Sequence, residues 1–422
     1  MIDRDRWRLR WGRLRQTLWW RPTLWSAAAV VAALASAVAD AWVPAAWLPP
    51  LPPGVVDDLL HIMATSMLAV STFALSVLVN AYASAASAGT PRATRLVVAE
   101  PRSQKAVAVF LAAFIFSIVG VIALAVGNYG PAGRMLLFGC AVGVLAWVIV
   151  SFMSYLDIMS RLGRVSHTIE TVERAAWPPL QAFARRPLGG ARAAHEPPVG
   201  AEAVRSNRTG HVQFIDVEAL QALARQRDGH VHVAVQAGDL VHPNTVLAWA
   251  SGEAGTSEAA GARGDDAVCD AFVIGAERSF EQDPAYGLIV LGEIAQRALS
   301  PGVNDPGTAI VVLGSQTRLL VRALQTPQDE HPAPCDRVSA APPDPAALPA
   351  VAFEPIARCC AGQFDVMVQL LRHLEAVSLN APAPVAEAVR ALAQRALGRA
   401  EREGADTEDL ARWREQAQAL GF

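Results

Sequence analysis

The sequence contains only one lysine, Lys105, among its 36 basic residues. No GxxxxGKS or GxxxxGKT motif surrounds this lysine, so the chain lacks a nucleotide-binding P-loop. A single lysine also excludes a Schiff-base lysine, or an attachment lysine for a lipoyl or biotinyl group, at any other position. We therefore expect no cofactor.

Cysteine is also rare and shows no metal-binding pattern. Zinc ligands recur at short, regular spacings, which are absent among the five cysteines Cys140, Cys269, Cys335, Cys359 and Cys360. The adjacent Cys359 and Cys360 are poor partners for a disulfide. The sequence therefore predicts buried thiols in a reducing compartment.

Three histidines lie near one predicted strand. His230 and His232 would project from one face of that strand, and His242 follows a turn. A zinc or copper site is the alternative to plain surface residues, but no acidic or thiol partner stands at a fixed spacing. The sequence favours solvent-exposed histidines and no metal site.

Charged residues make up only 18% of the 422 residues, whereas apolar residues make up 52%. This balance indicates a membrane part, and the length predicts two or three domains. A helix that crosses a bilayer requires about 20 apolar residues. Four stretches approach or exceed this length: 24–42, 59–84, 106–126 and 135–159.

The basic residues near the ends of these stretches predict their orientation, because cytoplasmic loops carry an excess of arginine and lysine. Such residues cluster before the first stretch, between the second and third, and after the fourth. The other two connections carry only Arg134. The bias toward arginine and alanine is typical of a GC-rich bacterial genome. We therefore expect a multi-pass protein of the bacterial inner membrane with both termini in the cytoplasm.

Residues 1–22 interleave tryptophan with arginine, which is typical of a helix lying on an anionic membrane surface. The same region also has the pattern of a signal peptide, with a basic start, an apolar middle and small residues near 36–41. Removal of residues 1–40 would leave the orientation of the other three helices unchanged. We favour an uncleaved interfacial helix.

The second apolar stretch carries small and polar residues along one helical face. At about 100° per residue, these fall within a sector roughly 100° wide: Asp58, His61, Thr65, Ala69, Thr72, Ser76, Asn80, Ala83 and Ser87. The opposite face is bulky and apolar and includes Met67, Phe73 and Leu78. Polar side chains face another helix or water rather than lipid. Two interpretations follow: a tight seam between helices, or the wall of a water-filled pore repeated around a symmetry axis.

In the pore interpretation, the first seven of these residues line the path. Asp57 and Asp58 at the outer mouth favour cations, whereas Arg92 and Arg95 at the cytoplasmic mouth act against this preference. Such a face needs more partners than four helices supply. We therefore expect a homo-oligomer in the lipid bilayer, with ions as its ligands and no nucleic-acid partner.

The cytoplasmic half begins with a helical extension and a linker over 161–204. Short strands and one helix are predicted over 205–280, where AGDLVHPNTVLA is similar to the turn of biotinyl- and lipoyl-type barrels. A small hammerhead-like β domain without a prosthetic group follows from this likeness. Residues 281–422 are predicted to be helical, with a loop at 326–350 and one long helix over 353–379.

Two Asp-Pro pairs, at 283–284 and 305–306, have the pattern of an N-cap followed by a first-turn proline. The segment LSPGVNDPGTAI at 299–310 is therefore predicted to be a rigid corner between two helices. Backbone amides at the start of the second helix would also suit an anion or a carboxylate of a neighbouring subunit. The candidate ligand or subunit contacts are Asn304, Asp305, Thr308 and Asp283. No nucleophile lies beside a base, so we expect no enzymatic activity.

The segments RSFEQDPAYGL, IAQRALSPGVNDPGTAI, GHVQFIDVEAL and GDLV accompany the apolar N-terminal half. Together they resemble the bacterial predicted-membrane-protein family DUF2254 over most of the chain. The most specific part is FEQDPAYGL followed by ALSPGVNDPGTA. The chain departs from the family at Pro243-Asn244, where a glycine-containing turn is usual, and in the 326–350 loop. The resemblance implies architecture and location, and it assigns no catalytic residue.

The sequence thus predicts a mainly α membrane protein with four transmembrane helices and a cytoplasmic α+β region. The predicted function is an oligomeric channel or pore-like protein, whose cytoplasmic domain gates or filters the path. The alternative is a non-conducting membrane scaffold or sensor, whose cytoplasmic domain binds a protein or a small ligand.

Overall fold

The computed structural model describes residues 20–36, 52, 54–88, 90–98, 101–126, 129–161, 164–252, 266–329 and 334–422. Most of the chain is helical, and a strand-containing region lies in its second half. The chain divides into two compact units, Met1–His167 and Thr168–Phe422. Each unit is described by itself.

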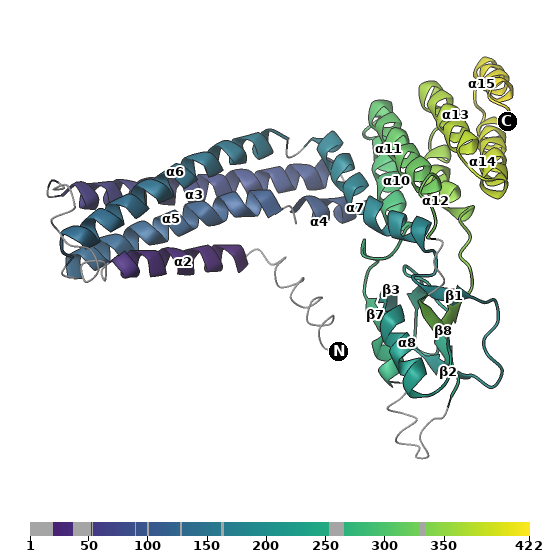
Figure 1. Ribbon diagram of the computed structural model, residues 1–422. Coiled ribbons are helices and arrows are strands. Elements are labelled where there is room, and N and C mark those ends of the chain that lie inside the picture. Colours follow the sequence, from purple (N-terminus) through teal and green to yellow (C-terminus); the bar gives the residue numbers. More distant parts are fainter. Residues whose placement is uncertain are drawn as a thin grey trace. The chain divides into compact units, whose positions relative to one another are not determined.

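The first unit is a helical bundle (Figure 1). Its helices are α2 (Trp20–Ser36), α3 (Val55–Ala88), α4 (Pro91–Val98), α5 (Pro101–Val126) and α6 (Pro131–Arg161). Three of them contain segments long and apolar enough to cross a membrane: Val55–Ser84, Lys105–Val126 and Pro131–Arg161. These segments confirm the second, third and fourth predicted membrane helices.

The first predicted membrane helix, 24–42, is only partly covered. Helix α2 has 17 residues and ends at Ser36, and the next six residues of the prediction lie outside the described residues. Most of the predicted interfacial helix, 1–22, also lies outside them. The described chain therefore supports three crossing helices, and a fourth remains a prediction.

Helix α5 is central to the first unit, because it packs against α2, α3 and α6. A glycine allows a close approach to α3: a Cβ atom on Gly120 would lie 3.0 Å from Leu60 Cδ1. Two tyrosines join distant segments. Tyr155 of α6 donates its hydroxyl to the Ala74 carbonyl of α3 at 2.6 Å, and Tyr129, just before α6, donates to the Ala33 carbonyl of α2 at 3.1 Å. Without water in the hydrocarbon layer, buried hydroxyls need such partners.

The second unit combines two sheets with a group of helices. The five-stranded sheet has the order β1-β8-β4-β6-β2, and the three-stranded sheet has the order β5-β3-β7. The strands are β1 (Ala191–Ala193), β2 (Glu202–Arg205), β3 (Gly210–Ile215), β4 (Val231–Val233), β5 (Leu240–Val241), β6 (Val246–Ala250), β7 (Phe272–Gly275) and β8 (Cys335–Ala340). Helix α8 (Val217–Gln226) contacts β4 and β8.

Three of these strands lie where the sequence predicts linker or loop. Strand β1 and the start of β2 fall within the predicted linker, and β8 falls within the predicted 326–350 loop. Strand β8 pairs in parallel with both β1 and β4, so the predicted loop supplies a central strand of the sheet. Long-range pairing of this kind leaves little local signal. The hammerhead type of this region remains a prediction.

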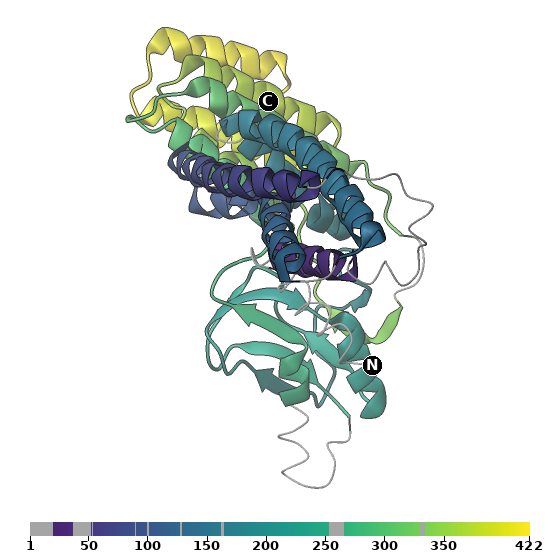
Figure 2. The ribbon, with the colours of Figure 1, turned by 90° about the vertical axis from the view of Figure 1, so that its left-hand side faces the viewer.

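The helical part of the second unit contains α10 (Tyr286–Ala298), α11 (Pro306–Leu324), α12 (Ala347–Ala357), α13 (Phe364–Leu379), α14 (Ala383–Arg402) and α15 (Thr407–Ala419). These helices gather at one end of the unit and the sheets with α8 at the other (Figures 1 and 2). The prediction of one helix over 353–379 is wrong, because a turn at 358–363 separates α12 from α13. That turn lets α12 and α13 pack against α14.

Candidate functional site

The polar face of α3 points away from the helices of its own bundle. All seven predicted lining residues are exposed in the single chain: Asp58, His61, Thr65, Ala69, Thr72, Ser76 and Asn80. The buried residues of α3 lie on the opposite side of the helix and include Leu60, Met67 and Leu78. Phe73, which the sequence places on the bulky apolar face, is 65% exposed and so lies outside the buried part of that face.

Two hydroxyls of this face are bonded within α3 itself. Thr65 donates to the carbonyl of His61 at 3.0 Å, and Thr72 donates to the carbonyl of Leu68 at 2.9 Å. Such bonds to the preceding turn satisfy the hydroxyl proton and leave the oxygen lone pairs free to accept. A carboxylate such as Asp58 has no proton to donate in this way, so it requires water, a cation or a donor from elsewhere.

Asp283 lies at the centre of a buried polar cluster in the second unit. Its side chain is 1% exposed and accepts a 2.6 Å bond from Nε of Arg278. Its other oxygen accepts the backbone N–H groups of Ala285 and Tyr286 at 3.0 and 3.1 Å. Asp283 therefore caps the start of α10, although the N-cap position itself is Ala285 rather than the predicted Asp283.

The GDLV turn packs directly on this cluster. Gly238 has a φ of +99°, and a Cβ atom there would lie 2.5 Å from Asp283 Oδ2. Only glycine combines this backbone conformation with so close an approach. Two of the segments that carry the family resemblance, GDLV and RSFEQDPAYGL, thus meet at one buried ion pair.

Replacing Asp283 by alanine should lower the free energy of unfolding of the second unit by about 3 kcal/mol. The change leaves the Arg278 charge without its partner and removes the acceptor for two backbone N–H groups. Asp283→Asn retains an acceptor oxygen and should lose about half as much. Chemical denaturation of the full chain measures both losses.

A matched control is Asp344→Ala. Asp344 is exposed and also accepts a backbone N–H, that of Ala346, at 2.9 Å. Its loss should lower the free energy of unfolding by about 1 kcal/mol or less, because water replaces the lost acceptor. Equal effects of the two alanine variants would contradict a special role for the buried pair.

The corner at 299–310 is organised by its own residues. Asp305 is the N-cap of α11, as predicted, and accepts the backbone N–H of Thr308 at 3.1 Å and its hydroxyl at 2.6 Å. These bonds hold the pKa of Asp305 below its usual value. Asn304 adopts a left-handed conformation with a φ of +48° and accepts a bond from Gln363 at 3.0 Å.

The four predicted contact residues do not form one site. Asp283 precedes α10, whereas Asn304, Asp305 and Thr308 follow its other end. A helix of 13 residues is about 20 Å long, so these two groups lie far apart. A ligand or subunit contact at either end remains a prediction.

A clamp between α7 (Val165–Arg185) and α11 is not predicted from the sequence. Arg318 donates two bonds to the carboxylate of Glu173, at 3.0 and 2.7 Å, and Arg322 lies over the ring of Trp177 at 3.8 Å. Burial alone would raise the pKa of Glu173, but hydrogen bonds from Arg318 and Ser315 outweigh it and lower that pKa. The sequence does contain one signal for this contact. Glu173 and Trp177 are four positions apart on α7, and their partners Arg318 and Arg322 are four positions apart on α11.

The histidine predictions meet a mixed outcome. His232 is buried, contrary to prediction, and its Nδ1 lies 3.1 Å from the Ser339 hydroxyl on β8. Burial lowers the pKa of this imidazole. His230 and His242 are exposed, as predicted. Within the described part of the chain, no three His, Cys, Asp or Glu side chains gather in a cluster able to hold a metal ion.

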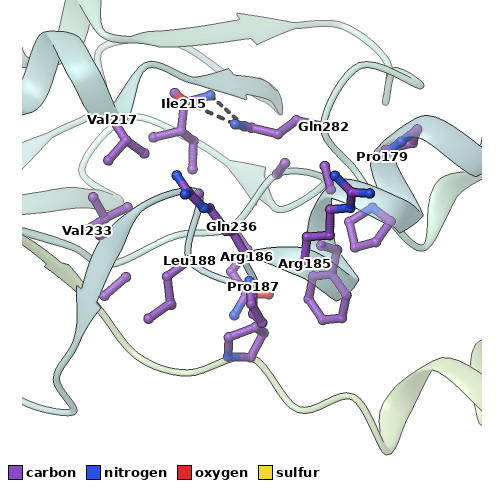
Figure 3. A pocket seen from close by; sticks show the side chains of 18 of the residues that line it. Pro179, Arg185, Arg186, Pro187, Leu188, Ile215, Val217, Val233, Gln236 and Gln282 are labelled. Carbon is purple, nitrogen blue, oxygen red and sulfur yellow. Dashed lines mark hydrogen bonds between the residues drawn. The ribbon is translucent and has the colours of Figure 1, made fainter. Parts of the chain in front are cut away.

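A pocket of about 460 Å³ opens in the second unit, between the end of α7 and the strands (Figure 3). Its walls come from the end of α7, the strands β3 and β4, and the segment after β8. Most of the described lining side chains are apolar, and the charged ones among them are Arg185, Arg186 and Asp329. No pattern in the sequence predicts this pocket, because its lining residues come from segments up to about 160 positions apart.

Similarity to known proteins extends over most of the chain. The family described as "Predicted membrane protein (DUF2254)" matches residues 15–376. The uncharacterized protein Rv1290c of Mycobacterium tuberculosis is 27% identical over 278 residues, which are 62% of this chain and 51% of that protein. The uncharacterized protein Mb1321c of Mycobacterium bovis gives the same values. The chain spans about half the length of these curated relatives, and no solved structure matches it.

Proposed function

Because the chain belongs to the DUF2254 family of predicted membrane proteins, we propose that it forms a homo-oligomeric channel in the bacterial inner membrane. In this proposal, the polar face of α3 lines a water-filled path shared between copies. The path would run from Asp58 and His61, through Thr65 and Thr72, to Asn80. The chain has no catalytic role in this proposal.

The observation that carries this proposal is the difference in burial between the two faces of α3. One face is buried against the bundle, and the opposite face is exposed from Asp58 to Asn80. A polar side chain that faces lipid lacks the hydrogen-bond partners that water or a neighbouring helix supplies, and this costs free energy. If several copies turned this face toward a common axis, its polar side chains would contact water or the neighbouring copies instead of lipid.

The proposed topology has four crossings with both termini in the cytoplasm. The first of these crossings would contain helix α2. The arginine-rich connections then lie on the cytoplasmic side, and Asp57 and Asp58 lie at the outer mouth, where they favour cations. The second unit would gate or filter the path from the cytoplasmic side.

A specific observation favours the alternative of a non-conducting scaffold or sensor. The hydroxyls of Thr65 and Thr72 are already bonded inside α3, so this face can also pack as a dry seam. Small residues and satisfied hydroxyls are typical of close helix–helix contacts in membranes. Both functions place α3 at an interface between copies, and they differ in whether water enters.

Cysteine cross-linking tests the interface. In a chain whose five native cysteines are replaced by alanine, Ser76→Cys is expected to cross-link copies in the membrane upon oxidation. Ala74→Cys is the matched control, because Ala74 is 1% exposed and faces the bundle. Cross-linking by Ala74→Cys but not by Ser76→Cys would contradict the proposed interface.

Planar-bilayer recordings of the purified full chain then separate the two functions. Salt-dependent conductance from protein shown to be oligomeric supports the channel. Cross-linked oligomers that never conduct, in either orientation and in several lipids, would reject the channel and support the scaffold.

A further inference from the structure

The pocket of the second unit has an apolar body. Its lining includes Phe183 and Pro179 from α7, Leu188 from the following turn, and Ile215, Val217 and Val233 from the strand region. Figure 3 places Arg185 and Pro179 at one side of this space, with Val217 and Val233 at the other. A volume of about 460 Å³ lies within the range of small-molecule sites, which is about 300–1,000 Å³.

The polar groups of the lining are mostly engaged with the protein itself. The Gln282 amide donates to the Ile215 carbonyl at 3.2 Å and accepts its N–H at 2.8 Å (Figure 3). Arg186 donates to Asp329 at 2.6 Å. A ligand rich in hydroxyl or amide groups would therefore find few free partners on these walls.

After the Arg186–Asp329 ion pair is set aside, the remaining charge of the described lining is positive. Arg186 neutralises Asp329, which is the sole acidic residue among the lining positions that the structure describes. Arg185 adds a positive charge, and this exposed side chain lies at the rim. The described lining residues therefore carry a net charge of +1, from two arginines and one aspartate. This charge attracts an anion and repels a cation.

We propose that this pocket binds a small organic anion with an apolar body, such as an aryl or alkyl carboxylate. The apolar walls would enclose the body, and the carboxylate would lie at the rim beside Arg185. Arginine suits this role because its planar guanidinium donates paired bonds to a carboxylate. The proposal does not rest on the channel function, since binding can be measured without conductance.

The test uses the full chain in lipid nanodiscs and three matched fluorine-labelled probes. These are a phenylbutyrate, the corresponding uncharged phenylbutanol and the corresponding phenylbutylamine. Fluorine NMR line broadening reports binding, and empty nanodiscs correct for partition into lipid. The carboxylate is expected to bind saturably, and about tenfold or more tightly than the amine.

Two variants and one control locate the site. Ala182→Trp fills the pocket from an exposed lining position on α7 and should abolish binding. Arg185→Gln should weaken carboxylate binding about tenfold and leave alcohol binding unchanged. Ala411→Trp, at an exposed position on α15 outside the pocket, should bind like the wild type.

Three results would overturn the proposal. The first is no saturable binding of the carboxylate by the wild type. The second is equal binding of all three probes, which would show that charge plays no part. The third is unchanged binding by Ala182→Trp with an unaltered melting temperature, which would place the probe elsewhere.

Discussion

The double substitution Thr72→Leu with Ser76→Leu is expected to abolish the conductance of the full chain in planar bilayers. Both side chains are exposed on the polar face of α3 near the middle of the helix. Leucine adds bulk and removes the hydroxyl groups that hold water. A narrow apolar constriction dewets and stops ion flow, so the residual current should fall below about a tenth of the wild-type value.

The control places two leucines on another exposed surface of the same bundle. Val150→Leu with Met153→Leu changes two residues of α6 that are 66% and 61% exposed. These positions face lipid in the proposed channel, so conductance should stay within about twofold of the wild type. The separate Ser76→Cys chain serves to show that copies still meet at this face. If that chain cross-links and the current through the α3 double variant is unchanged, this path is ruled out.

Gly287→Ala is expected to destabilise the second unit strongly, although it adds a single methyl group. A Cβ atom on Gly287 would lie 2.1 Å from the Cβ atom of Ala176 and 2.9 Å from its Cα atom. Because the obstacle includes the backbone of α7, no side-chain rotation relieves the clash. Overpacking of this kind costs about 3 kcal/mol or more, which corresponds to a melting temperature lower by roughly 6–12 °C.

Gly398→Ala is the matched control for this prediction and should have the opposite sign. Gly398 lies inside α14, and a Cβ atom there would lie 3.5 Å from the nearest atom, the Nη1 of Arg402. With space available, alanine stabilises a helix relative to glycine by up to about 1 kcal/mol. Thermal unfolding of both variants in the same detergent measures the contrast. A loss of stability in both would mean that steric contact with Ala176 is not the cause.

Features that depend on neighbouring residues were predictable from the sequence. The N-cap at Asp305 and the start of α11 follow from an Asp-Pro pair that carries its own hydrogen-bond acceptor and fixed φ. The three long apolar helices follow from composition over about 20 residues. The polar face of α3 follows from helical periodicity alone.

Features that depend on distant residues were not predictable in the same way. Strand β8 is short and lies between proline-rich segments, and its strand form depends on pairing with β1 and β4. The turn that separates α12 from α13 lies within a stretch whose periodicity favours one continuous helix. His232 is buried on β4 beside Ser339 of β8, which lies 107 positions away in the sequence.

The candidate site likewise combines features that neighbouring residues determine with features that distant residues determine. The sequence by itself determined that α3 has one polar face, that Asp305 begins α11, and which family the chain resembles. Only the tertiary structure decided that the polar face of α3 points away from its own bundle, and that Asp283 is buried against Arg278 beneath Gly238. The same holds for the pocket beside Arg185. Periodicity and capping are encoded within a few residues, whereas burial and pairing depend on where remote segments of the chain pack.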